Sequence, residues 1–153
     1  MGIISRQAGP RPSKGDKDRR GVNSPNGGKV VTVYGNEIAA SVVSTNQLPY
    51  PNDSVIVMET TLLAKGVDGK PVADGKGGWT RGAVSGMHVM RRGKGFGEAY
   101  GKNRSGDWEF AEYKPDGSYI TPPAKSAACA QCHIKAGPEK DFVYQARLGA
   151  SAK

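Results

Sequence analysis

Short apolar runs, separated by clusters of glycine, proline, asparagine and aspartate, occupy most of the chain. Residues 29–34 form a β-branched run and residues 54–63 a longer apolar one, and both patterns predict strands. Residues 107–113 alternate apolar with polar side chains, which is typical of a strand with one buried face. The pattern therefore predicts short strands joined by turns, with few long helices.

Weaker patterns extend this expected sheet. Residues 79–90 predict a further strand, although glycines loosen its pattern. Residues 118–121 are expected to pair back across the Pro-Asp-Gly turn that precedes them. Asn36 is a suitable N-cap, so we expect a short helix over residues 36–43. Residues 91–97 predict a glycine-rich, solvated connection.

The last third of the chain changes character. Residues 124–136 are rich in alanine and predict a helix, which Gly137 and Pro138 end. Residues 139–147 predict one more short helix. Strands first and helices afterwards indicate the α+β class. We expect a mostly antiparallel β-sheet with flanking short helices and a C-terminal helical segment that carries the chemistry.

Composition and charge divide the chain into two parts. Its 153 residues suit one folded domain, and its net charge of +8 is partly concentrated near the start. Residues 1–28 hold little apolar surface, so we expect a flexible basic N-terminal arm there and one domain over residues 29–153. A solvated tail is favoured over docking to anionic lipid or an acidic partner. Nucleic-acid binding has no support, because no base-reading or stacking module follows.

One motif carries recognisable chemistry. Cys129-Ala-Gln-Cys132-His133 matches C-x-x-C-H, the attachment signature of c-type haem. Two thiols three residues apart can each reach a vinyl group on one porphyrin edge, and the following imidazole can ligate the iron. The motif thus predicts one covalently attached haem c, anchored by Cys129 and Cys132, with His133 as the metal ligand.

Two other interpretations of the motif are weaker. A redox dithiol fits C-x-x-C, but the βαβ pattern of a thioredoxin-like fold does not precede it. A zinc site would need His88 as a fourth ligand, and the adjacent Cys132 and His133 are poorly placed to share one tetrahedral ion. Both cysteines of the chain lie inside the motif, which favours haem.

The sequence does not decide which group, if any, is the sixth ligand of the iron. An iron held only by His133 leaves a face for nitric oxide, carbon monoxide or a substrate, whereas a second protein ligand makes a closed electron carrier. The candidates for a second ligand are His88, Met58, Met87 and Met90. Each of them is more often a core residue than a ligand.

Three segments resemble the cytochrome P-460 family, which includes the cytochromes c′-β. Residues 32–34 are followed by a short helix and a proline turn, and residues 53–59 are similar to the family's strand of the form Val-x-Val-Lys-Glu. Residues 129–133 with residues 140–144 are similar to its C-x-x-C-H and Asp-Tyr-Val-Phe ending. The resemblance covers residues 29–147. It implies an antiparallel sheet with flanking helices, a homodimer and a five-coordinate haem with an open distal pocket.

The family's catalytic members link a strand lysine to the porphyrin and oxidise hydroxylamine or nitric oxide. Here the matching residue is Met58, which cannot form that link, so the chain resembles more closely the cytochromes c′-β, which lack the lysine and bind nitric oxide and carbon monoxide. We expect Met58 and Phe96 in an apolar distal cap, together with Tyr50, and Arg147 near the proximal haem side. Further candidates are two carboxylates that could relay protons on the distal side, Glu59 and Glu98.

The resemblance leads to three expectations of function. The first is a gas-binding and redox cytochrome, the second a closed electron carrier, and the third an enzyme that oxidises hydroxylamine or nitric oxide. We also expect a small gas or nitrogen-oxide ligand and a redox partner protein. A c-type cytochrome is assembled after export, so we expect a periplasmic protein, although the first residues lack the apolar region of a secretory signal.

Overall fold

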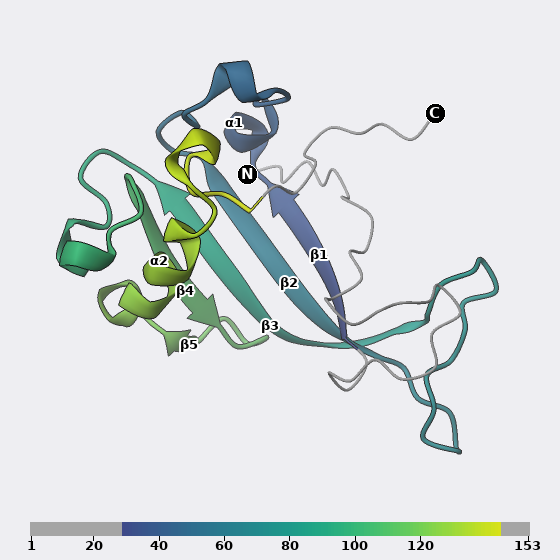
Figure 1. Cartoon of the computed structure of the whole chain (residues 1–153). Helices are drawn as coiled ribbons and strands as arrows, with labels where there is room; N and C mark the ends of the chain where they lie inside the picture. Colours follow the sequence, from purple (N-terminus) through teal and green to yellow (C-terminus); the bar gives the residue numbers. More distant parts are fainter. Residues whose placement is uncertain (1–28, 145–153) are drawn as a thin grey trace.

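Five strands form one antiparallel sheet whose order, β1-β2-β3-β4-β5, follows the order of the chain. The structure is a computed structural model and describes residues 29–144. Each strand pairs with the next one along the chain, as Figure 1 shows. The strands are Lys29–Gly35 (β1), Val55–Leu63 (β2), Arg81–Arg92 (β3), Trp108–Tyr113 (β4) and Tyr119–Thr121 (β5).

Short helices flank the sheet. The two α-helices are Glu37–Ala40 (α1) and Ala127–Ile134 (α2). The 3₁₀ helices are Thr45–Gln47, Glu98–Asn103, Pro123–Lys125 and Pro138–Lys140. Helix α2 packs against β4 and lies in front of the sheet in Figure 1. No helix within residues 29–144 is long and apolar enough to cross a bilayer.

The register of the sheet brings residues from three strands into rows. Residues directly opposite each other in an antiparallel pair point to the same face. Met58 pairs with His88, and His88 with Glu112. A neighbouring row is made by Ile56 on β2, Met90 on β3 and Phe110 on β4. Both rows lie on the face that α2 partly covers, so the sheet presents six side chains toward this helix.

The core is packed between this sheet face and the helices. Trp108 is fully buried, and the ring of Tyr50 meets it edge-on with centroids 5.6 Å apart. Ala39 of α1 and Ala130 of α2 are also fully buried, where their small side chains let the helices approach the sheet closely. This packing fixes α2 relative to β4.

The expected α+β architecture is confirmed. The predicted strands at 29–34, 54–63, 79–90, 107–113 and 118–121 all form, and their boundaries move by at most two residues. The capping role of Asn36 is confirmed as well, since its Oδ1 accepts a hydrogen bond from the N–H of Ala39 at 2.9 Å. Strand β3 runs on to Arg92, through residues expected in the glycine-rich connection.

The helix predicted over residues 139–147 is wrong within the described part of the chain. One 3₁₀ turn ends at Lys140, after which Asp141 and Phe142 have positive φ angles of 49° and 59°. This left-handed backbone cannot continue a right-handed helix. Residues 145–147 and the predicted arm at residues 1–28 lie outside the described residues.

Candidate functional site

A cavity of about 390 Å³ opens between the sheet and α2. Strands β1 to β4, helix α2 and residues 143–144 form its walls. Most of the lining side chains are apolar, which suits a largely hydrophobic cofactor. The lining residues are Val33, Ile56, Met58, His88, Val89, Met90, Phe110, Ala111, Glu112, Cys129, Cys132, His133, Val143 and Tyr144.

Helix α2 brings the three motif residues to one side of this cavity. Cys129 and Cys132 lie three residues apart, so they face the same way from adjacent turns. Both thiols are free, with Cys129 half-buried and Cys132 exposed. Burial and the nearby charge of Glu112 raise the pKa of the Cys129 thiol, although a hydrogen bond from its own backbone acts in the opposite direction. The neutral thiol is therefore the resting form of Cys129.

The imidazole of His133 is oriented by a backbone carbonyl. Its Nδ1 lies 2.7 Å from the carbonyl oxygen of Phe142. A carbonyl can only accept, so Nδ1 carries the proton and Nε2 keeps a free lone pair. Burial lowers the pKa of His133, which keeps this ring neutral at pH 7. A neutral imidazole with a free Nε2 is the form that binds iron.

Two aromatic rings hold the His133 imidazole in place. The ring of Phe110 lies 4.6 Å from it, centroid to centroid, and the ring of Tyr144 meets it edge-on at 5.3 Å. Tyr144 also donates a hydrogen bond from its hydroxyl to the carbonyl oxygen of Cys132 at 2.7 Å. The imidazole is thus fixed by contacts from β4, α2 and the segment after it.

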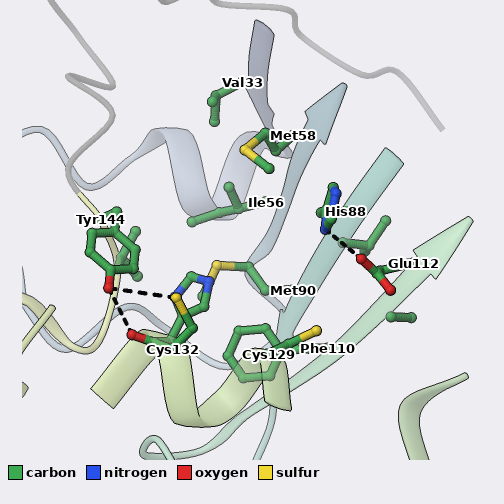
Figure 2. Close-up of a pocket in the computed structure, with 14 residues that line it drawn as sticks. Val33, Ile56, Met58, His88, Met90, Phe110, Glu112, Cys129, Cys132 and Tyr144 are labelled. Atoms are coloured by element: carbon green, nitrogen blue, oxygen red, sulfur yellow. Dashed lines mark hydrogen bonds and ion pairs between the residues drawn. The ribbon is translucent and has the colours of Figure 1, made fainter. Parts of the chain in front are cut away.

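This donor set fits a covalently attached haem. Two free thiols and a neutral imidazole on one short helix line the same apolar cavity, as Figure 2 shows for Cys129 and Cys132. Within residues 29–144, no three His, Cys, Asp or Glu side chains gather in a way that could hold a metal ion directly. The zinc alternative therefore has no ligand cluster in this part of the chain.

The sheet provides the opposite wall of the cavity. Val33, Ile56 and Met58 supply apolar side chains from β1 and β2. One polar pair interrupts this wall: Nδ1 of His88 lies 3.2 Å from a carboxylate oxygen of Glu112. Figure 2 shows the two side chains next to each other on neighbouring strands. A carboxylate accepts, so this contact leaves Nε2 of a neutral His88 unprotonated.

The family model of Cytochrome P460 matches residues 13–145, which is most of the chain. The chain belongs to the cytochrome P460 family. Membership implies a haem c protein of nitrogen-oxide redox chemistry, in agreement with the donor set on α2. No match is found among the curated proteins.

The cavity of this cytochrome P460 family member contains only some of the side chains proposed from sequence. Met58 lines it together with Cys129, Cys132 and His133. Met90 and His88 line it as well, whereas Met87 pairs with Glu59 and Tyr113 on the other face of β3. Arg147 lies outside the described residues.

The other proposed distal residues do not line this cavity. Phe96 stands in the turn after β3, close to Gly93, where the guanidinium of Arg91 lies 5.6 Å from its ring centroid. This turn lies in the connection from β3 to β4, and Phe96 is absent from the cavity lining. The ring of Tyr50 packs on Trp108 instead. The two carboxylates proposed as proton relays, Glu59 and Glu98, are likewise absent from the cavity lining.

Sequence reasoning missed several residues of the cytochrome P460 site. Glu112 and Phe110 stand two positions apart in the alternating strand β4, so the alternation already placed them on one face. Which face points to α2 depends on the pairing of β4 with β3, which the alternation does not contain. Nothing in the local sequence indicates that the carbonyl of Phe142 meets His133.

Proposed function

We propose that this chain is a mono-haem c-type cytochrome, similar to the cytochromes c′-β, whose haem keeps an open distal position for nitric oxide or another small gas. The observation that carries the proposal is the cavity itself. An imidazole ready to bind iron lies on one side of it, and the apolar side chain of Met58 lines it as well. The family resemblance matches Met58 to the cross-linking lysine of the catalytic members.

The residues of α2 would hold the cofactor. Cys129 and Cys132 would form the two thioethers, and His133 would ligate the iron through Nε2 while Nδ1 donates to Phe142. A bound haem supplies an iron that binds nitric oxide and exchanges one electron with a partner. The chain itself contributes attachment, orientation of the imidazole and a shaped apolar wall.

The apolar wall favours neutral diatomic ligands. Val33, Ile56 and Met58 offer no hydrogen bond to water or to an anion, so a polar ligand loses its solvation there without compensation. Nitric oxide and carbon monoxide lose little solvation on entry. This difference supports binding of a neutral gas in the part of the cavity that lies away from the His88–Glu112 pair.

One observation favours a second candidate, the closed electron carrier. The contact of His88 Nδ1 with Glu112 resembles the hydrogen bond to a carboxylate that orients metal-bound histidines. It leaves Nε2 of His88 as a second donor atom in the cavity. If this atom reached the iron, the haem would be six-coordinate and would exchange electrons without binding gas.

Optical spectra separate the two candidates. For the open haem we expect a high-spin ferrous spectrum that changes on addition of carbon monoxide or nitric oxide. For the closed haem we expect a low-spin ferrous spectrum that does not change. A low-spin spectrum insensitive to carbon monoxide would exclude the proposed gas-binding function.

His88→Ala tests whether His88 is the second protein ligand of the haem iron. For the open haem we expect the ferrous spectrum of this variant to equal that of the unsubstituted protein, because His88 then makes no bond to iron. Glu112→Gln serves as its matched control, since it keeps the shape of the side chain and removes the charge next to His88. A change from low to high spin in His88→Ala would instead support the electron carrier.

Met58→Ala tests the apolar wall. Removing this side chain widens the cavity, so we expect carbon monoxide to associate about fivefold faster, which corresponds to a barrier lower by about 1 kcal/mol. Phe96→Ala is the control, because Phe96 is not part of the cavity lining. Its association rate should stay within about twofold of the original, as for most substitutions away from a site. Stopped-flow or flash photolysis measures both, and equal rates in all three proteins would contradict the role of Met58.

The location, the partner and the oligomeric state of this protein are part of the proposal as well. We propose a periplasmic protein that acts with a redox partner protein and forms a homodimer, in line with the family resemblance. Analytical ultracentrifugation of the haem-loaded protein tests the dimer, and a monomer at micromolar concentration would contradict it.

A further inference from the structure

A buried ion pair includes Asp141, the residue before Phe142, whose carbonyl contacts the imidazole of His133. Nε of Arg92 donates to Oδ2 of Asp141 at 3.1 Å, and the two side chains are only 13% and 7% exposed. Removing two charges from water is costly unless hydrogen bonds compensate for the lost hydration. Such a pair is therefore weak evidence for stability, and its position suggests another use.

Asp141 is held from three separate parts of the fold. Its carboxylate also accepts the backbone N–H of Tyr50 at 3.0 Å, and its carbonyl oxygen accepts the indole N–H of Trp108 at 2.9 Å. Arg92 comes from the end of β3 and Trp108 from the start of β4. The contacts fix both the side chain and the backbone of Asp141.

The backbone that these contacts hold is strained. Asp141 and Phe142 both have left-handed φ angles, 49° and 59°, in succession. A non-glycine residue adopts this conformation at a cost in free energy, so the surrounding contacts must hold it there. The Phe142 N–H donates to the carbonyl oxygen of Gly137 at 2.9 Å. This turn directs the carbonyl of Phe142 to Nδ1 of His133, at 2.7 Å.

We propose that Asp141, held by Arg92 and Trp108, is a positioning residue that fixes the Phe142 carbonyl and thereby sets the orientation and donor strength of the His133 imidazole. The proposal rests on the proposed function in so far as His133 ligates the haem iron. A firmly held acceptor at Nδ1 makes the imidazole a stronger donor to metal. A stronger donor favours the ferric state, so loosening this turn should favour the ferrous state.

Asp141→Asn tests this role in the haem-loaded protein. The amide keeps the size of the side chain but removes the charge that holds Arg92. We expect the iron–histidine stretching band to shift to lower frequency in resonance Raman spectra. We also expect the ferric–ferrous equilibrium to shift about tenfold toward ferrous, which is about 59 mV for one electron.

Asp107→Asn is a matched control. Asp107 also lies near Arg92, with 3.9 Å between Nη2 and Oδ2, but its main partner is Arg104 at 2.6 Å. Its carboxylate is bonded to Arg104 and not to the turn at residues 141–142. Its stretching band and potential should stay at the original values. Equal shifts in both variants would reduce the effect to general electrostatics and overturn the proposal.

A second variant covers the case in which Asp141→Asn yields no folded haem protein. Trp108→Phe keeps most of the buried ring and removes only the N–H that the Asp141 carbonyl accepts. The same two shifts would support the positioning role, and original values would overturn it. A haem-loaded original protein with a low-spin ferrous spectrum that ignores carbon monoxide would instead contradict the proposed open haem, and the potentials of the two variants would still test the positioning role.

Discussion

A Cys129→Ser, Cys132→Ser double variant is expected to carry no covalently attached haem. Serine has nearly the size of cysteine, but its hydroxyl does not add to a porphyrin vinyl group as a thiol does. Both thiols of the chain lie in this motif and are free to react. The loss should therefore be complete rather than partial.

Intact mass and the pyridine haemochrome spectrum measure this result after expression with export and haem attachment. The single variant Cys129→Ser is the control, because Cys132 remains and should keep one thioether. Its haemochrome band should lie between those of a two-thioether haem and a free haem. Covalent haem in the double variant would contradict the assignment of both anchors.

Replacing His133 is expected to have the second largest effect. His133→Gly removes the only imidazole on α2, so any haem that the chain still carries should lack the iron–histidine stretching band. Added imidazole should restore the band, because the glycine leaves a ring-sized space between Phe110 and Tyr144. Resonance Raman spectra of the ferrous protein provide the measurement.

The amount of haem that His133→Gly carries does not decide this test. A smaller haem-loaded fraction is compatible with the prediction, since the readout is taken from that fraction alone. At the same imidazole concentration, the frequency of the iron–histidine band of the original protein should not change, because His133 already fills its proximal position. An unaltered stretching band in His133→Gly would show that another residue ligates the iron on this side.

The turn at Asp141 and Phe142 connects the sheet to the imidazole of His133. The strained turn after α2 is not part of the C-x-x-C-H motif, yet its carbonyl sets the tautomer of His133. The contacts that hold the turn come from β3 and β4. The sheet would thus influence the iron from the proximal side as well as forming the distal wall.

Features that depend on local spacing could be predicted from the residues alone. Alternation and β-branched runs located the strands, because a strand's period of two is written in consecutive residues. Asn36 indicated the start of α1 since a cap bonds within its own turn. The C-x-x-C-H motif likewise needs only one helical turn to bring Cys129 and Cys132 to one side.

Which side chains share the cavity with that motif depends on contacts between elements that are far apart in the sequence. Alternation shows that Met87 and His88 face opposite ways, but the pairing of β3 with β2 and β4 decides that His88 and Glu112 line the cavity. Phe96 is not among the lining residues, because it lies in the connection after β3 and not on a strand. The left-handed turn at Asp141 depends on partners 33 to 91 residues away, and no local pattern records contacts at that distance.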